Sequence, residues 1–224
     1  MTRRPAYASV VFDVDSTLTG IEGVDWLAAL RDTETAAYVK GLTARVMAGE
    51  LPIEAAYVSR LDRIAPTRDE LRRLAQAYGA AAAPGAREAI AALEAAGVRV
   101  VAVSGGLAAA VVPFCVSLGF AEGDVHAVPV EWNGRGEYTG MDPATPLATQ
   151  TGKATVVRAL GLPHPILAVG DGSTDVEMKR QGVVDAFAAY TGFTHRNAVV
   201  AAADFTVGTF ADLASRVLGS ADAA

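Results

Sequence analysis

Five short apolar runs, separated by segments of helical character, constrain the fold of this chain more than any other feature. The runs are Ser9–Phe12, Val98–Val103, Ile166–Val169, Ala186–Tyr190 and Phe205–Val207. Each has the length and apolar character of a buried strand. Strands that alternate with helices indicate an α/β fold with a mostly parallel sheet. The chain has 224 residues, 51% of them hydrophobic, which is enough to form a substantial core.

A long stretch between the first two runs, from about Gly20 to Ala83, contains helical patterns only. Thr67 and Glu70 form a capping-box pattern at the start of one helix, and Gly79 marks its expected end. Three other helices are expected at residues 22–30, 34–47 and 52–63. We therefore expect an α/β core of residues 1–19 and 84–224 with a small helical domain, residues 20–83, inserted after the first strand.

Proline, glycine and asparagine residues at the ends of segments predict three more elements within the core. Pro84 and Gly97 bound one helix, and Gly161 follows a helix from about residue 151 to residue 160. Asn133 and Gly134 lie between extended segments, from Val128 to Tyr138, which indicates a tight β-hairpin.

Composition excludes several classes of protein. The net charge is -6 with no basic run, which argues against a nucleic-acid partner. Cys115 is the single cysteine, so neither an internal disulfide nor a thiolate zinc site can form. No apolar segment approaches the roughly 20 residues of a membrane span, and no export signal is visible. A cytoplasmic location without a membrane partner is expected, and the sequence does not indicate an oligomeric state.

Asp13 and Asp15 follow the first strand at alternate positions, so both side chains are expected on one side of the strand exit. An isolated pair of this kind can simply end a strand. Here, Ser104–Gly106 and Gly170–Asp175 also follow predicted strands. In open α/β sheets, ligands bind at the carboxyl ends of the strands, so the three clusters are expected to meet in one site.

The three clusters and Lys153 carry groups suited to a phosphate and a metal. Ser104, Gly105 and Gly106 are expected to offer a hydroxyl and amides to an oxyanion at a helix N-terminus, although a simple Ser cap is an alternative. Asp171 and Asp13 can supply the carboxylate oxygens that Mg²⁺ prefers. Lys153 is expected at the start of a helix, where a cation opposes the helix dipole unless an anion binds there too.

The four clusters, in this order, resemble the haloacid dehalogenase superfamily: Asp13-Val14-Asp15-Ser16-Thr17, then Ser104, then Lys153, then Gly170-Asp171-Gly172-Ser173-Thr174-Asp175. The helical insertion further resembles the phosphoserine phosphatases of that superfamily. The match extends to Glu22-Gly23-Val24-Asp25, Met47, Arg60, Thr151-Gly152 and Arg196, and covers most of the chain. The resemblance implies a Rossmann-like core under a helical cap.

The resemblance also implies a reaction and a set of site residues. Asp13 would form an aspartyl phosphate, and Asp15 would act as the acid and base. Mg²⁺ would be held by Asp13, the backbone carbonyl of Asp15 and Asp171, with Asp175 supporting the site. Ser104 and Lys153 complete the implied catalytic set. Substrate contacts are implied for Glu22, Met47, Arg60, Ser104, Gly105, Lys153 and Thr174.

The implied substrate is O-phospho-L-serine, whose hydrolysis is the last step of serine biosynthesis. Glu22 would pair with its ammonium group and Arg60 with its carboxylate. Arg60 has separate support, because it shares a helical face with Ile53, Tyr57 and Ile64, where an arginine needs an anion or must reach past the bundle edge. Ala48, where the family often has glycine, departs from the pattern and bears on the exact substrate.

Three alternatives remain open. A signalling receiver also phosphorylates an Asp at a strand end, but it lacks the second Asp and the helical insertion. A second alternative is a binding protein on an inactive catalytic fold, yet every implied catalytic position is filled. Among enzymes, the alternative is a phosphatase or phosphotransferase that acts on another small phosphomonoester, such as phosphohomoserine.

Overall fold

Six parallel strands form the central sheet of the computed structural model, which describes residues 4–47, 50–142 and 144–219. In spatial order they are β3 (Val125–Val128), β2 (Arg99–Leu107), β1 (Ser9–Phe12), β6 (Ile166–Gly170), β7 (Ala186–Tyr190) and β8 (Phe205–Val207). The predicted α/β fold with a mostly parallel sheet is confirmed. β3 is an additional strand that the apolar runs did not predict.

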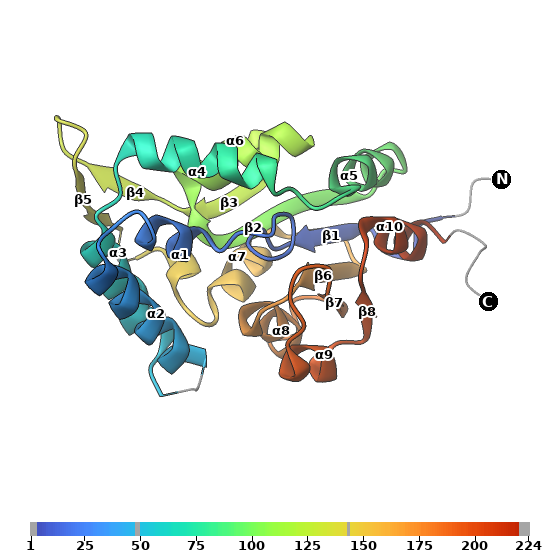
Figure 1. The fold of residues 1–224 in the computed structure, drawn as a ribbon. Helices are drawn as coiled ribbons and strands as arrows, with labels where there is room; N and C mark the ends of the chain where they lie inside the picture. The colour runs from blue at the N-terminus through green and yellow to red at the C-terminus, as the bar shows by residue number, and fades with distance from the viewer. Residues whose placement is uncertain (1–3, 48–49, 143, 220–224) are drawn as a thin grey trace.

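β1 lies in the middle of the sheet and is buried on both faces (Figure 1). Ser9 faces Arg99 of β2 on one side and Ile166 of β6 on the other. From β1, the strands β2 and β3 extend the sheet towards one edge. The later strands β6, β7 and β8 extend it towards the other edge. The carboxyl end of β1 is therefore the switch point where a crevice opens in sheets of this kind.

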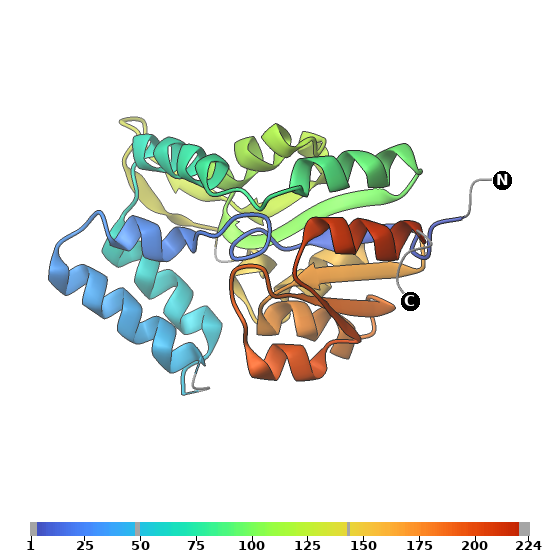
Figure 2. The same cartoon turned by 45° about the vertical axis from the view of Figure 1, so that its right-hand side comes forward.

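Helices cover both faces of the sheet (Figures 1 and 2). One layer contains α5 (Ala86–Ala95), α6 (Ala108–Leu118) and α10 (Phe210–Leu218), and the other contains α7 (Gly152–Leu160), α8 (Ser173–Arg180) and α9 (Asn197–Ala202). Two 3-10 helices, η1 (Glu122–Asp124) and η2 (Pro146–Ala148), lie in connections. In α10, Phe210, Leu213 and Val217 recur at helical spacing and are buried against the core. Among the described helices, none has both the length and the hydropathy to span a bilayer.

The segment after β1 forms the four expected helices, α1 (Gly23–Ala28), α2 (Thr33–Met47), α3 (Ile53–Ile64) and α4 (Arg68–Ala80). The capping box of Thr67 and Glu70 is present, but α4 continues through Gly79 to Ala80, because the backbone hydrogen bonds of the last turn persist. α1 to α3 project from the sheet, whereas α4 packs against α6 (Figure 1). The division at residues 19 and 84 stays a prediction.

The predicted hairpin forms, with a longer loop than expected. Its strands are β4 (Val130–Trp132) and β5 (Tyr138–Met141). The amide of Asn133 donates to the carbonyl of Glu137, so residues 134–136 form the loop, and Gly136 adopts a φ of 77°. That left-handed residue is typical of a three-residue hairpin loop rather than a two-residue turn. The hairpin packs against α3 and places Trp132 under the guanidinium of Arg68.

Candidate active site

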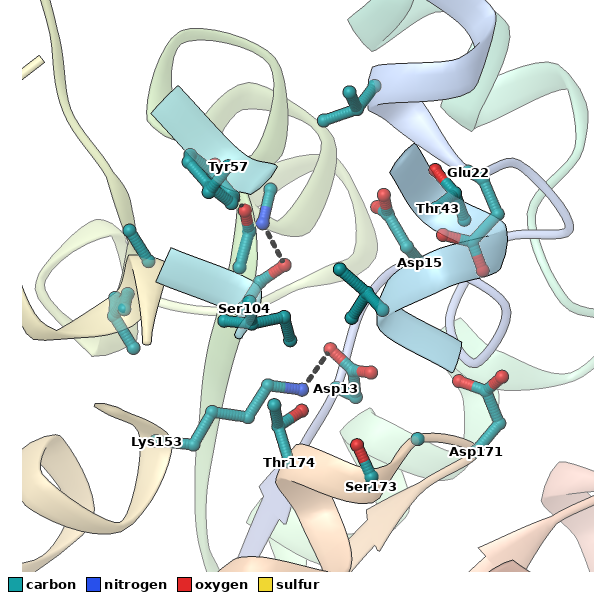
Figure 3. Close-up of a pocket in the computed structure, with 18 of the residues that line it drawn as sticks. Asp13, Asp15, Glu22, Thr43, Tyr57, Ser104, Lys153, Asp171, Ser173 and Thr174 are labelled. Atoms are coloured by element: carbon teal, nitrogen blue, oxygen red, sulfur yellow. Dashed lines mark hydrogen bonds and ion pairs between the residues drawn. The ribbon is translucent and has the colours of Figure 1, made fainter. Parts of the chain in front are cut away.

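A cavity of about 250 Å³ lies between the carboxyl ends of the strands and the helices α1 to α3. Its walls contain Asp13, Asp15, Glu22, Arg60, Ser104, Gly105, Lys153, Asp171 and Thr174, which are nine of the residues that the sequence indicated. Figure 3 shows that seven of them converge from separate elements: Asp13, Asp15, Glu22, Ser104, Lys153, Asp171 and Thr174. The three predicted clusters therefore meet in one site. The side chain of Met47 and the departing residue Ala48 lie outside the described residues.

Asp13 and Asp15 both line the cavity, as the alternate spacing predicted. The amide of Asp13 donates to the carbonyl of Val169, so this residue is held by the neighbouring strand β6 at 2.9 Å. Asp15 is held instead by groups from the inserted helices. The amide of Gly23 donates to its Oδ2 at 2.8 Å, and the hydroxyl of Tyr78 donates to its Oδ1 at 2.7 Å.

The environment of Asp15 favours its protonated form. Burial, the charge of Glu22 and that of Asp13 together raise the pKa of Asp15 to about 8. The hydrogen bonds from Gly23 and Tyr78 favour the carboxylate and offset part of this shift. At neutral pH the group therefore carries a proton, and at slightly higher pH it can accept one. These are the properties of an acid that also serves as a base.

Ser104, Gly105 and Gly106 occupy a different local structure from the one expected. They lie within β2, which continues to Leu107, and α6 begins only at Ala108. The pairing of β2 with β3 shifts register between Val103 and Leu107, so the strand is irregular here. The Oγ of Ser104 accepts from the amide of Gly106 at 2.9 Å instead of capping a helix. The prediction of a helix N-terminus at these residues was wrong, although Ser104 and Gly105 do line the cavity.

Lys153 lies in the first turn of α7, with 4% of the residue exposed. Its Nζ lies 2.7 Å from Oδ1 of Asp13 and 2.7 Å from Oδ1 of Asp175. Burial alone would lower the pKa of Lys153, but the two carboxylates raise it, so the ammonium stays charged. The preceding Gly152 allows this placement, because a Cβ there would lie 1.7 Å from the carbonyl oxygen of Pro146.

Three buried carboxylates form a cluster beside Lys153. Carboxylate oxygens of Asp13, Asp171 and Asp175 all lie within 4.8 Å of one another. Burial and then the charge of Asp13 raise the pKa of Asp171 to about 6 and that of Asp175 to about 7. Desolvated carboxylates that repel one another are stabilised by a cation, and a cluster of hard oxygen donors suits a divalent ion. The residues present therefore fit a metal site.

Arg196 joins this cluster to the inserted helices. Its Nη2 lies 3.2 Å from Oδ2 of Asp171 and 3.3 Å from Oε1 of Glu22. Oδ2 of Asp171 also accepts from the hydroxyl of Thr194 at 2.9 Å, and Glu22 accepts from the hydroxyl of Ser16 at 2.8 Å. Arg196 was noted in the family pattern but was not predicted as a site residue.

Arg60 and Tyr57 reach the cavity from α3. The Nη1 of Arg60 donates to Oγ1 of Thr43 at 3.2 Å, whereas its Nε is buried without a hydrogen-bond partner among the described residues. Burial lowers the pKa of Arg60, but its guanidinium group stays charged at neutral pH. The hydroxyl of Tyr57 donates to the carbonyl of Gly105 at 2.6 Å. The helical face that Tyr57 shares with Arg60 predicted the location of Tyr57, but it did not predict this contact with β2.

The sequence was also compared with known proteins. The family model of haloacid dehalogenase-like hydrolases matches residues 10–180. The chain belongs to this family. The resemblance predicted from the four motifs is thus confirmed, and with it the Rossmann-like core.

Curated members of the family include close relatives of the chain. A phosphoserine phosphatase of Mus musculus is 35% identical over 92% of this chain and 91% of its own length. The human phosphoserine phosphatase is 34% identical with the same coverage. A chloroplastic phosphoserine phosphatase of Arabidopsis thaliana is 33% identical over 92% of this chain and 70% of its own length. The chain is therefore an enzyme of this hydrolase family that cleaves phosphomonoesters, as the sequence predicted.

Solved structures show the same fold. A phosphoserine phosphohydrolase-like protein of Francisella tularensis superposes with a TM-score of 0.82 over 92% of this chain and 98% of its own, at 23% identity. A phosphoserine phosphatase solved as an analogue of a phospho-aspartyl intermediate gives a TM-score of 0.77 over 94% and 98%, also at 23% identity. Both solved structures therefore share the fold of this chain over almost all of its length.

Proposed function

We propose that this enzyme hydrolyses O-phospho-L-serine to L-serine and phosphate through an aspartyl phosphate, with Mg²⁺ as its cofactor. The relatives named above support the substrate class. The observation that carries the proposal is that charges of both signs line one small cavity. Glu22 and Arg60 lie on the side of the inserted helices, and Lys153 with the carboxylate cluster lies on the side of the sheet. A phosphorylated amino acid offers the matching charges.

In the first step, a carboxylate oxygen of Asp13 attacks phosphorus and forms a new P–O bond. The bond from phosphorus to the serine oxygen breaks, and Asp15 gives its proton to that oxygen. An alkoxide is a poor leaving group, so this proton is needed for serine to depart. The raised pKa of Asp15, about 8, supports its role as the acid.

In the second step, Asp15 is a carboxylate and takes a proton from a water molecule. The water oxygen bonds to phosphorus, and the bond between phosphorus and Asp13 breaks. Phosphate is released, and Asp13 and Asp15 return to their starting protonation states. The same two carboxyl groups therefore complete the cycle without a further acid or base.

Positive charge and hydrogen-bond donors must hold the phosphate oxygens in both steps. Lys153, Ser104, Gly105 and Thr174 line the cavity beside Asp13 and are proposed to do this. Asp13, the backbone carbonyl of Asp15 and Asp171 would hold Mg²⁺, and Asp175 would support them. When bound, Mg²⁺ would neutralise negative charge on the phosphoryl group.

The amino-acid part of the substrate is proposed to bind under the cap. The carboxylate of Glu22 would pair with the substrate ammonium, and the guanidinium of Arg60 with the substrate carboxylate. The buried Nε of Arg60, which lacks a partner among the described residues, supports a bound anion at this place. Met47 is also proposed to contact the substrate.

A substrate panel tests the proposal. The purified enzyme is assayed with Mg²⁺ on O-phospho-L-serine, O-phospho-D-serine, phosphohomoserine and a hexose phosphate, with Asp13→Asn as the background control. We expect the highest kcat/KM for O-phospho-L-serine. A preference for phosphohomoserine or a sugar phosphate would refute the substrate. Transfer of phosphate to an added alcohol, rather than to water, would show a phosphotransferase.

A role in serine biosynthesis is part of the proposal, and a cytoplasmic location stays a prediction. The relative in Arabidopsis thaliana is a chloroplastic protein, so membership of the family does not fix the compartment. The family assignment and the filled catalytic positions favour the phosphatase over a receiver or an inactive binding protein.

A further inference from the structure

The carboxyl group of Asp15 belongs to the core, but both of its oxygens are held by the inserted segment. Oδ2 accepts from the amide of Gly23 at the start of α1, and Oδ1 accepts from the hydroxyl of Tyr78 near the end of α4. Two hydrogen bonds to different oxygens fix the plane of a carboxyl group as well as its position. Asp15 still lines the cavity in this orientation.

Packing around Tyr78 fixes where its hydroxyl lies. The residue is fully buried, and its ring lies 5.4 Å from that of Phe114 on α6. Its backbone carbonyl accepts from the hydroxyl of Thr19 at 3.1 Å, which ties this turn of α4 to the end of the β1 loop. A hydroxyl on a rigid ring, anchored at both ends, can orient a neighbouring group with little loss of entropy.

Gly23 makes room for this contact. A Cβ at position 23 would lie 2.1 Å from the hydroxyl oxygen of Tyr78 and 3.2 Å from Cδ2 of Leu74. Any larger residue would therefore displace the hydroxyl from Asp15. The glycine supplies one hydrogen bond to Asp15 directly and permits the other by its lack of a side chain.

We propose that Tyr78 is a positioning residue for Asp15, which its hydroxyl orients so that the carboxyl group faces the leaving oxygen of the substrate. This inference rests on the proposed function, because it assumes that Asp15 transfers the proton. No proton passes through Tyr78: Asp15 gives its proton to the leaving oxygen and later takes one from water. Proton transfer depends steeply on distance and angle, so a misoriented carboxyl group slows it.

Tyr78→Phe removes the hydroxyl and keeps the ring, so it tests the proposal with little change in packing. The assay compares kcat/KM for phenyl phosphate and for p-nitrophenyl phosphate, since kcat/KM covers only the steps up to departure of the phenol. Nitrophenolate leaves without a proton, whereas phenolate is more basic and needs one. We expect a loss of about tenfold with phenyl phosphate and little change with p-nitrophenyl phosphate.

Tyr190→Phe is the matched control, because Tyr190 is also buried but lies in β7 against Phe193 and Phe210. It should leave both substrates unaffected. Gly23→Ala is a second variant that displaces the hydroxyl by contact. It should reproduce the substrate-dependent loss. The double variant with Tyr78→Phe should be no worse than either one, because the severest contact of the added methyl group, at 2.1 Å, is with the oxygen that Tyr78→Phe removes.

Equal losses on both aryl phosphates, or no loss on either, would overturn the proposal. Thermal melting of each variant separates a lower folded fraction from a slower reaction. The parent enzyme on O-phospho-L-serine tests the proposed function independently. A parent that prefers another phosphomonoester refutes that substrate, yet the comparison of the two aryl phosphates still decides the role of Tyr78.

Discussion

The Nζ of Lys153 lies 2.7 Å from Oδ1 of Asp13, so the carboxylate proposed as nucleophile is paired with a buried cation before any substrate arrives. The same Nζ also contacts Asp175, which has no solvent exposure. One lysine thus offsets the charge of two desolvated carboxylates. Its location in the first turn of α7 is unfavourable for a cation in isolation and is explained by these two partners.

Lys153→Met should therefore harm both stability and activity. Removal of the ammonium leaves two buried carboxylates without their cation, at an expected cost of about 3 to 5 kcal/mol in the free energy of unfolding. Urea unfolding at neutral pH measures this cost, and phosphate release measures activity. Lys179→Met is the matched control, because the pair of Lys179 with Asp204 is partly exposed and should contribute about 1 kcal/mol at most.

Asp13→Asn should abolish turnover and leave the fold intact. An amide oxygen is a weak nucleophile, so the aspartyl phosphate cannot form, and the proposed metal site loses an anionic ligand. We expect phosphate release to fall to the background rate with Mg²⁺ in excess. The melting temperature should lie within a few degrees of that of the parent. Clear residual turnover would contradict the covalent route.

The metal-free enzyme should become less stable as the pH rises. The pKa values of Asp15, Asp171 and Asp175 are raised to about 8, 6 and 7, well above those of unfolded carboxyl groups. Between about pH 5 and pH 8 the folded state therefore binds more protons than the unfolded state, and the free energy of unfolding falls with rising pH. At lower pH the carboxyl groups of Asp32, Glu70, Asp185 and Asp204, whose pKa values are lowered by their hydrogen-bond partners, act in the opposite sense. His126, whose pKa is lowered by burial, acts in the opposite sense.

Melting curves from pH 5 to pH 8, with EDTA or with Mg²⁺, test this expectation. With EDTA we expect the melting temperature to fall by several degrees across the range, since about 1 kcal/mol corresponds to about 2 to 4 °C in a chain of this size. With Mg²⁺ the fall should be smaller, because the cation binds the deprotonated cluster. Identical curves with and without EDTA would count against a metal site at these residues.

Arg60→Ala and Glu22→Ala should lower activity only on a substrate that carries the ammonium and carboxylate groups of phosphoserine. Loss of either side chain leaves a charged end of phosphoserine without its partner, at an expected cost of about 2 to 5 kcal/mol in transition-state binding. The kcat/KM for phosphoserine should fall at least tenfold, because the expected cost exceeds the roughly 1.4 kcal/mol that corresponds to a factor of ten. Hydrolysis of p-nitrophenyl phosphate, which lacks both groups, should change little. Parallel losses on both substrates would show that the two residues maintain the cap instead.

Much of the site could be predicted because it is encoded locally. The alternate spacing of Asp13 and Asp15, and the position of Asp171 after an apolar run, follow from strand geometry alone. The helical spacing of Tyr57 and Arg60 predicted that they lie on one face of α3. What sequence patterns could not show is which partner each helix meets across the cavity.

Tyr78 is the clearest example of that limit. Within α4 it reads as an ordinary buried aromatic residue, and its contact with Asp15 depends on how α4 docks on α6. Arg196 lies between β7 and α9, where no periodicity indicates the direction of a side chain. The extension of β2 through Ser104 was missed because glycines at a strand end favour a turn, whereas an irregular register keeps these residues in the strand.

The central location of β1 sets the order in which this enzyme can acquire activity as it folds. Ser9 of β1 pairs with Arg99 and Ile166, so both neighbours of the strand that precedes the proposed nucleophile are distant in sequence. Such non-local pairings make folding slow and cooperative. During synthesis, Asp13 and Asp15 leave the ribosome long before Lys153 and Asp171. Activity should therefore return late in refolding, in the same kinetic phase as the pairing of β1 with β6, and not in proportion to the helix content recovered earlier.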